Sequence, residues 1–416
     1  MNGLRKLTGL SAVLCLGFVP SARADVVSDW NLFAVLAIGA AGRPPGGAPF
    51  LDIATVHLAM HDAVAAIDHQ FQPYNVAISG AKGSPVAAAA TAAHDVLVNR
   101  FPAQAASLDS TYTQYVAAHG LSQNDPGVAV GQQAAAGIIA FRATDGSFPS
   151  QSTPFTGGSA PGQWRPTPPA LASMATPWLA TVRPFALTSP QQFRANPPPS
   201  LTSQMYTLAY NEVKDYGSLF NSKRTPEQTD LAYFWSGNYL LVWNSALRNI
   251  ASSQKLDVGK SARLFALANM AMADAAITAW DSKLFYAIWR PITAIQFGDT
   301  AGNPGTVGDP TWQPLIVTPP YPDYSSGANN VTGAVTRILR SFFGTNAMSF
   351  PVTTTAPQAV QQTRMYQTFT DAADEVVIAR VFEGIHFSFA DVEARKQGES
   401  VATWVFDHFL RPAGQP

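Results

Sequence analysis

Apolar residues recur at three- and four-residue steps over long stretches of this chain, which is the spacing of one face of an α-helix. Few runs rich in Val, Ile and Thr alternate with period two, so strands are expected to be scarce. We therefore expect an all-α fold. The main stretches with helical spacing are 53–67, 87–98, 128–141, 261–289, 331–342, 371–382 and 392–409.

Two segments interrupt the helical pattern. Prolines recur between residues 149 and 200, and proline stops a long helix. This segment also holds Trp164, Trp178 and Phe185, so we expect an ordered crossover that buries these rings. Residues 298–322 form a second loop rich in Gly and Pro. The predicted architecture is two helical bundles of four-helix type with long connections, an N-terminal bundle at 25–148 and a C-terminal bundle at 201–416.

The composition changes this picture little. Hydrophobic residues make up 47% and charged residues 13% of 416 residues, which is enough apolar surface for a large core. The formal net charge of -1 provides no general attraction for nucleic acid or for an anionic membrane. Any affinity for anions must therefore come from a local cluster of residues.

The first 24 residues have the features of a secretory signal peptide. Arg5 and Lys6 precede an apolar stretch at 10–19, and Ala22-Arg23-Ala24 fits an A-x-A cleavage site. The apolar stretch is shorter than the roughly 18 residues of a membrane span, and no later segment is expected to span a membrane. The only cysteine, Cys15, lies in this leader. We expect an exported protein, periplasmic or extracellular, with no disulfide after cleavage.

Two cations lie in an apolar, aromatic setting. Lys283 and Arg290 are seven residues apart, which on one helix would place them on the same face about 10 Å apart. Pro291 is expected to end that helix directly after Arg290. The neighbours at 284–289 include Leu, Phe, Tyr, Ile and Trp, so the cations are expected to be buried. Burying unpaired cations is very unfavourable, and we infer that they bind an anion.

A predicted helix start follows the second loop. Residues 321–327 read Tyr-Pro-Asp-Tyr-Ser-Ser-Gly and precede an amphipathic pattern. Ser325 or Ser326 would cap this helix and leave its first backbone N–H groups and its positive dipole end free for an anion. Gly327 would let a ligand approach the backbone closely. An ordinary N-cap after a turn is the alternative.

Arg380 and His386 lie on either side of Gly384. Six positions on an unbroken helix would separate them by about 120° around the axis. Their convergence therefore requires a break in the helix near Gly384. A histidine satisfied inside the core is the alternative interpretation of His386.

Together these positions resemble the signature of the vanadium-dependent haloperoxidase and type 2 phosphatidic acid phosphatase superfamily. That signature reads K-x6-RP, then PSGH, then SR-x5-H-x3-D. The residues that match in order and in spacing are Lys283, Arg290-Pro291, Ser326-Gly327, Arg380 and His386. Trp280, Tyr321 and the stretch His-Leu-Ala-Met-His-Asp-Ala-Val near the N-terminus look more like the haloperoxidase branch.

The resemblance implies two helical bundles and a bound tetrahedral oxyanion. His386 would be the vanadate ligand of a peroxidase or the nucleophile of a phosphatase. Vanadate is the implied cofactor, with phosphate as the alternative anion, and the implied substrates are small molecules: halide with hydrogen peroxide, or a phosphoester. The residues implied to bind the oxyanion are Lys283, Arg290, Ser326, Gly327 and Arg380.

The chain departs from the signature at the positions that handle protons. Ala328 stands where the family has its proton-donating histidine, and such acid–base assistance is typically worth about 10²–10⁴ in rate. Ala390 stands where the family aspartate would orient His386, and Ala379 replaces the serine before Arg380.

Neighbouring residues are candidates for support at the site. Asp391 lies one position after Ala390 and is expected to point elsewhere on a helix, yet it remains a candidate for support. The other candidates for support or for a substitute proton relay are Trp280, Tyr321, Asp323, Tyr324 and Asn329.

Three hypotheses for the function follow. The first is an exported haloperoxidase-like enzyme that oxidises halide, the second a phosphomonoesterase that forms a phosphohistidine, and the third a non-catalytic oxyanion-binding protein. A homo-oligomer is compatible with each. His57 and His61 have a spacing that could bind zinc, but no third ligand is identifiable, and we expect His61 and Asp62 to order the helix or line the cleft floor.

Overall fold

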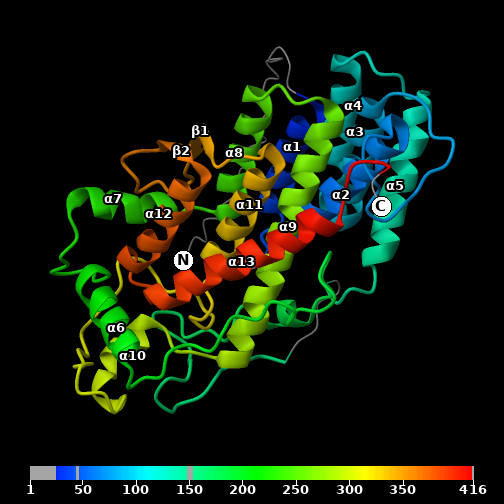
Figure 1. Ribbon diagram of the computed structural model, residues 1–416. Coiled ribbons are helices and arrows are strands. Elements are labelled where there is room, and N and C mark those ends of the chain that lie inside the picture. The colour runs from blue at the N-terminus through cyan, green and yellow to red at the C-terminus, as the bar shows by residue number, and fades with distance from the viewer. Residues whose placement is uncertain (1–24, 44–45, 148–152, 415–416) are drawn as a thin grey trace, which may run out of the picture.

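The computed structural model describes residues 25–43, 46–147 and 153–414, and within them the chain is predominantly helical (Figure 1). The all-α prediction is confirmed. The expected signal peptide, including Cys15, and the expected start of the crossover at 149 lie outside the described residues. The α-helices are α1 (Val26–Ala40), α2 (Ala48–Asp68), α3 (Pro85–Arg100), α4 (Ala105–Ala118), α5 (Pro126–Arg142), α6 (Gln204–Tyr216), α7 (Pro226–Trp235), α8 (Tyr239–Ser253), α9 (Val258–Tyr286), α10 (Pro291–Gln296), α11 (Gly327–Phe343), α12 (Phe369–Phe382) and α13 (Ser388–His408).

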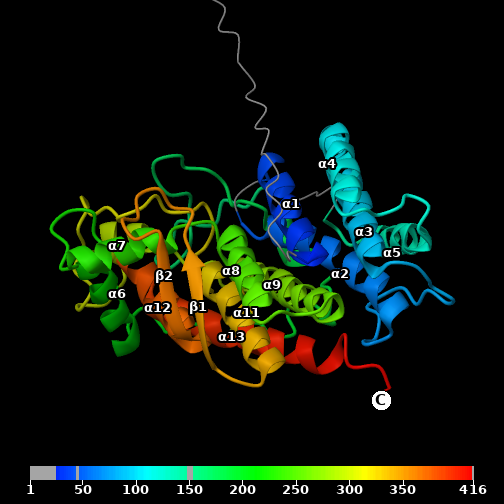
Figure 2. The same ribbon diagram turned by 90° about the horizontal axis from the view of Figure 1, so that it is seen from above.

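The helices gather in two groups that share three long helices. Figures 1 and 2 show α2–α5 at one end of the molecule and α6, α7, α10 and α12 at the other, with α9, α11 and α13 between them. One hydrophobic core runs through both groups, because α2 packs against α9 and α1 packs against α8. The 29-residue helix α9 is the axis of this arrangement, and nearly every side chain from Gly259 to Lys283 is buried.

Helix α2 is long and apolar enough to cross a membrane by composition, with a mean hydropathy of 1.4. We expected no segment after the leader to be long and apolar enough for a membrane span, and this expectation is wrong for the composition of α2. The helix is hydrophobic on all sides because it lies inside the protein, where 94% of its most apolar 18-residue stretch is buried.

The crossover is ordered, as predicted, over its described part from residue 153. It contains one short 3-10 helix, Pro177–Thr181, and buries Trp164 completely and Phe185 to 5% exposure, while Trp178 is half-buried. Asp274 of α9 accepts the backbone N–H groups of residues 185–187 at 2.6, 2.7 and 3.1 Å. A buried carboxylate thus satisfies backbone groups that have no helix of their own and fixes the crossover against α9.

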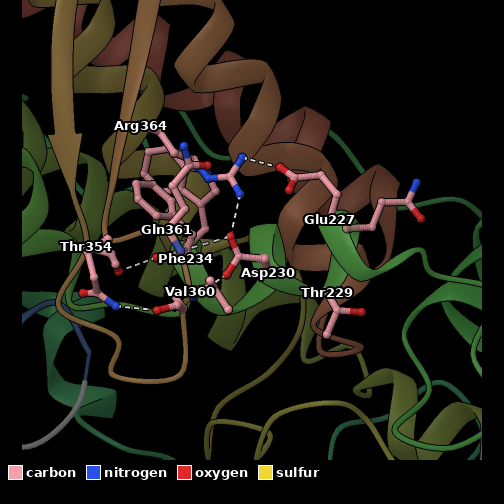
Figure 3. A network of polar contacts seen from close by, with 12 residues as sticks. Glu227, Thr229, Asp230, Phe234, Thr354, Val360, Gln361 and Arg364 are labelled. Atoms are coloured by element: carbon pink, nitrogen blue, oxygen red, sulfur yellow. Dashed lines mark hydrogen bonds and ion pairs between the residues drawn. The ribbon is translucent and has the colours of Figure 1, made fainter.

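A β-hairpin was not predicted. Strands β1 (Ala347–Thr353) and β2 (Thr363–Thr368) are antiparallel, with Phe350 opposite Tyr366. Their apolar face joins the core, and Figure 3 shows how Arg364 of β2 attaches the hairpin to α7: its guanidinium pairs with Glu227 at 2.8 Å and with Asp230 at 2.9 Å. The strands are short and alternate weakly, so the sequence pattern gave no signal for them.

Helices α11 and α13 approach each other closely at two glycines. A Cβ atom at Gly333 would lie 2.4 Å from the carbonyl oxygen of Arg395, and one at Gly398 would lie 2.0 Å from the carbonyl oxygen of Asn330. Both distances are shorter than any real contact, so only glycine allows this spacing. The distance between the two helices matters because α11 begins directly after Ser326 and α13 begins two residues after His386.

Candidate active site

Four segments meet at the site that the sequence motifs predicted. They are the end of α9 with the loop that follows it, the loop before α11, the end of α12 with its loop, and the start of α13. The charged side chains that they contribute are almost inaccessible to solvent: His386 is 1% exposed, Arg380 is 6% exposed, and Lys283 and Arg290 are 0% exposed. The partly exposed members are Tyr321, Gly327 and Ala328.

Lys283 and Arg290 converge as predicted. The prediction that they lie on one helix is wrong. Helix α9 ends at Tyr286, and Ala287 adopts a left-handed conformation with φ 46°. Arg290 is the extended residue before α10, and Pro291 begins that short helix instead of ending α9. The prediction was wrong because a left-handed alanine is uncommon and has no sequence signal.

Residues 321–323, in the loop before α11, hold both basic side chains. The ammonium group of Lys283 donates to the carbonyl oxygens of Pro322 and Asp323 at 2.7 and 3.1 Å. Arg290 Nε donates to the carbonyl oxygen of Tyr321 at 2.7 Å, and the Tyr321 ring lies 5.0 Å from the lysine nitrogen and 4.9 Å from the guanidinium carbon. Carbonyl dipoles and a π face thus lower the electrostatic penalty of bringing two cations together.

The break that was expected near Gly384 is present. Helix α12 ends at Phe382, Gly384 has φ 79°, and His386 lies in the short loop before α13. A Cβ atom at Gly384 would lie 2.3 Å from the carbonyl oxygen of Gly217, so the turn requires glycine for both its conformation and its packing. Through this turn Arg380 and His386 both reach the site.

His386 is neutral and has two charged neighbours. Its Nδ1 lies 2.7 Å from Asp323 Oδ1, and Arg290 Nη1 lies 3.1 Å from Nε2 and 3.4 Å from Nδ1. Burial lowers the pKa of His386 well below its usual value, and Arg290, Lys283 and Arg380 act in the same direction. A guanidinium can only donate hydrogen bonds, so the ring nitrogen that it faces must carry a lone pair.

The first turn of α11 points its N-terminus into the site. Ser326 is the N-cap residue, as predicted, but its side chain makes no capping hydrogen bond. Its own N–H donates to the carbonyl oxygen of Ala390 at 3.2 Å, so this group, which was expected to face the oxyanion, is already used. The following N–H groups of the turn and the helix dipole remain the elements suited to an anion. Trp280 covers Gly327, where an added Cβ would lie 3.2 Å from the indole ring.

Three buried acidic side chains complete the site, and the sequence pattern gave little indication of them. Glu383 Oε2 lies 2.5 Å from Arg380 Nη1, and Asp323 lies 3.7 Å from Arg290 Nη1. Asp391 was expected to point away, yet it is 0% exposed and accepts a hydrogen bond from Asn329 at 2.8 Å. Because α13 begins only at Ser388, the register of an unbroken motif helix does not apply to Asp391.

The three carboxyl groups match the three basic side chains in number, and burial together with the charge of Arg290 lowers the pKa of Lys283 well below its usual value. Burial raises the pKa of Asp323 to about 7, against the attraction of Arg290 and Lys283, and it raises the pKa of Glu383 to about 7, against that of Arg380. Burial also raises the pKa of Asp391 well above its usual range. The inference that the cations require an external anion was therefore too strong, because the protein supplies internal ones.

Unused donors nevertheless remain around His386. Arg290 Nη2 and Arg380 Nε are buried without a hydrogen-bond partner among the described residues. Charged donors left unsatisfied in the interior are unfavourable, and a tetrahedral oxyanion would satisfy them. The residues present thus fit a compact oxyanion when Glu383 and Asp391, whose pKa values burial raises, are protonated. In that form they would donate hydrogen bonds instead of repelling the anion.

The other candidate histidines are structural. His57 Nε2 contacts Asn31 Nδ2 at 2.8 Å, and His61 Nε2 contacts the carbonyl oxygen of Gln72 at 3.0 Å. Asp62 accepts three backbone N–H groups, those of residues 74–76, at 2.6 to 3.0 Å. Across the described ranges no group of His, Cys, Asp and Glu side chains could hold a metal ion, so no partner completes a zinc site at His57 and His61.

Comparison with known proteins gives one consistent result. The family model for the VCPO second helical-bundle domain matches residues 263–415, which include every predicted site residue. The chain is 27% identical to a vanadium chloroperoxidase of Curvularia inaequalis, in a match that covers 52% of this chain and 46% of that protein. The match therefore spans less than half of the curated relative.

Solved structures resemble the chain over most of its length. The first bacterial vanadium-dependent iodoperoxidase superimposes with a TM-score of 0.79 at 27% identity and covers 94% of this chain and 98% of its own. A bacterial vanadium-dependent chloroperoxidase in its holo form has a TM-score of 0.69 at 19% identity, with 92% of each chain covered, and this similarity concerns the fold alone. In its helical architecture, in the family match at residues 263–415 and in these relatives, the chain is similar to the vanadium haloperoxidases.

Proposed function

We propose that this chain is an exported, vanadate-binding oxidoreductase of the haloperoxidase type, with His386 as the vanadate ligand. The observation that carries the proposal is the position of His386: neutral, 1% exposed, and surrounded by Lys283, Arg290 and Arg380 at the start of α11. Neutral imidazole is a ligand, and fixed cations stabilise oxo groups without reorganisation. Halide and hydrogen peroxide are the proposed small-molecule substrates.

The residues of the chain have distinct roles in this proposal. Arg290 and Arg380 would bind oxyanion oxygens through the donors that are unused in the structure, Arg290 Nη2 and Arg380 Nε. Lys283 would donate hydrogen bonds from a fixed position at the loop carbonyls, and a bound oxyanion would favour its charged form against the burial that lowers its pKa. Bound vanadate would supply the Lewis acidity that activates peroxide toward halide. Tyr321 and the Ala328 side of α11 form the less buried edge, where small substrates would enter.

The relatives support this proposal over its closest alternative. The iodoperoxidase resembles the chain from end to end, and both it and the fungal chloroperoxidase are vanadium enzymes by name. Phosphate has the same shape and charge distribution, so a phosphomonoesterase would use the same residues, with His386 as nucleophile. We propose export on the basis of the leader sequence at 1–24.

One observation favours a second candidate function, a non-catalytic oxyanion-binding protein. Ala328 and Ala390 occupy the two positions where acid–base residues would be expected, and neither can transfer a proton. General acid–base assistance of about 10²–10⁴ in rate would be missing unless another group supplies it.

A single set of measurements separates these functions. Purified protein is titrated with orthovanadate, followed by ⁵¹V NMR, and then assayed for peroxide-dependent bromination and iodination; hydrolysis of p-nitrophenyl phosphate is assayed without vanadate. The His386→Ala variant, checked for its fold by circular dichroism, is the matched control. We expect vanadate binding and halide oxidation that both disappear in the variant. Binding without either activity would support the oxyanion-binding protein, and hydrolysis alone would support the phosphatase. No binding of vanadate or phosphate would refute all three.

A further inference from the structure

The carboxylate beside His386 comes from an unexpected part of the chain. The motif leads one to expect it four residues after the histidine, but Ala390 stands there, fully buried, and its carbonyl oxygen accepts the N–H of Ser326. The carboxylate that lies next to the ring is Asp323, from the loop before α11, with Oδ1 2.7 Å from Nδ1. Asp391, the residue directly after Ala390, contacts Asn329 instead.

Asp323 is fixed more firmly than an ordinary loop residue. Its N–H donates to the carbonyl oxygen of Ile288 at 3.0 Å, and its own carbonyl oxygen accepts from Lys283 at 3.1 Å. Its side chain is 0% exposed, so it has few alternative orientations. A group held at both its backbone atoms can impose its position on the ring beside it.

The contacts of His386 are consistent with one tautomer. If Nδ1 carries the proton toward Asp323, Nε2 carries the lone pair, and Arg290 should lie closer to Nε2. It does, at 3.1 Å against 3.4 Å for Nδ1. Asp323 Oδ1 lies off the ideal N–H axis, so its contact with Nδ1 is close without being a full hydrogen bond. The N–H of Phe387 also faces this carboxyl group, and the backbone of Asp323 is a second acceptor near the ring. The contact with Nδ1 is nevertheless shorter than the ion pair of the same oxygen with Arg290 Nη1, at 2.7 Å against 3.7 Å.

We propose that Asp323 is the positioning residue of His386, replacing the carboxylate lost at Ala390. It holds the proton on Nδ1 and so presents the Nε2 lone pair to the oxyanion. The role at the oxyanion rests on the proposed function, whereas the effect on the tautomer does not. Residues that orient a ligating histidine typically change ligand affinity about 10- to 100-fold when they are replaced.

The test compares full-length wild type with Asp323→Asn and Asp391→Asn. Long-range ¹H–¹⁵N spectra of protein labelled with ¹⁵N-histidine report which ring nitrogen is protonated, and loss of a signal in His386→Ala assigns it. We expect wild type to show the Nδ1–H form and Asp323→Asn to shift His386 toward Nε2–H. The orthovanadate Kd of Asp323→Asn should rise by about 10- to 100-fold. Asp391→Asn, an equally buried carboxylate, should leave the tautomer unchanged.

Two results would overturn the proposal. One is a wild-type His386 that carries its proton on Nε2, a measurement that needs no variant and holds even if Asp323→Asn does not fold. The other is a folded Asp323→Asn with the wild-type tautomer and a Kd within about twofold of wild type. If wild type binds no vanadate yet the tautomer changes in Asp323→Asn, the proposed function fails while the positioning role stands. Partial recovery of the Nδ1–H form in Asp323→Glu would support positioning over a purely structural effect.

Discussion

Replacing Glu383 by glutamine should strengthen oxyanion binding, because Glu383 competes with the oxyanion for Arg380. The carboxylate lies 2.5 Å from Arg380 Nη1, and both side chains are buried, at 0% and 6% exposure. Glutamine keeps the size of the side chain and can still accept one hydrogen bond from the guanidinium. The substitution removes a negative charge that a bound oxyanion would otherwise face across Arg380.

The magnitude follows from Coulomb's law. With the guanidinium between them, carboxylate and oxyanion would lie about 7 Å apart, and at an effective dielectric constant of about 20 their repulsion is about 2 kcal/mol per unit charge. That free energy corresponds to a factor of about 30 in Kd. Burial raises the pKa of Glu383 to about 7, so wild type loses the charge by itself in acid. The gain in vanadate affinity of Glu383→Gln over wild type should be full above about pH 8 and absent below about pH 6.

Isothermal titration with orthovanadate at both pH values measures the effect. Glu212→Gln, which removes the same charge from an exposed position on α6, is the matched control and should change Kd by less than about twofold. Glu383→Gln should melt somewhat earlier than wild type, because it breaks a buried pair whose loss typically costs about 3–5 kcal/mol when a charge is left alone. A folded variant with unchanged or weaker binding at about pH 8 would refute the competition.

Four further outcomes are expected. Ala328→His should raise bromide oxidation by about 10² or more, and an unchanged rate would mean that the proton is supplied elsewhere. Vanadate affinity of wild type should fall as pH rises through about 7, where Glu383 becomes charged beside Arg380; affinity that is flat between about pH 6 and about pH 8 would contradict this. Asp62→Ala leaves three backbone N–H groups without their acceptor and should lower the free energy of unfolding by about 3 kcal/mol in urea titrations; a loss under about 1 kcal/mol would not fit. Arg364→Ala should lower it by about 1 kcal/mol by loosening the hairpin (Figure 3), without changing vanadate Kd.

The sequence was sufficient for the helices and for the cations of the site. Periodicity located α2, α9, α11 and α13, because these helices bury a continuous face and repeat it over several turns. The spacing of four residues predicted a single site: Lys283, Arg290, Arg380 and His386. The prediction of one continuous helix from Lys283 to Arg290 was nevertheless wrong. A motif records which side chains meet, whereas the left-handed turn at Ala287 depends on packing that no local pattern reveals.

The acidic half of the site could not be found in the same way. Glu383 follows Arg380 by three residues and could have been considered, since side chains three apart on a helix are neighbours. Asp323 and Asp391 reach their partners only after three loops have folded together, so their roles depend on tertiary contacts. The hairpin was missed for a similar reason, because its strands are defined by their contact with α7 and α8.

The equal number of buried cations and buried carboxyl groups has a consequence for how the protein matures. A buried cluster of Lys283, Arg290 and Arg380 alone would be destabilised by mutual repulsion and would need an anion in order to fold. With Asp323, Glu383 and Asp391 buried in the same cluster, the protein supplies its own negative charge, so folding would not depend on the proposed oxyanion. Folding and binding of the proposed oxyanion would then be separate events, so a newly synthesised chain would fold before it binds the oxyanion.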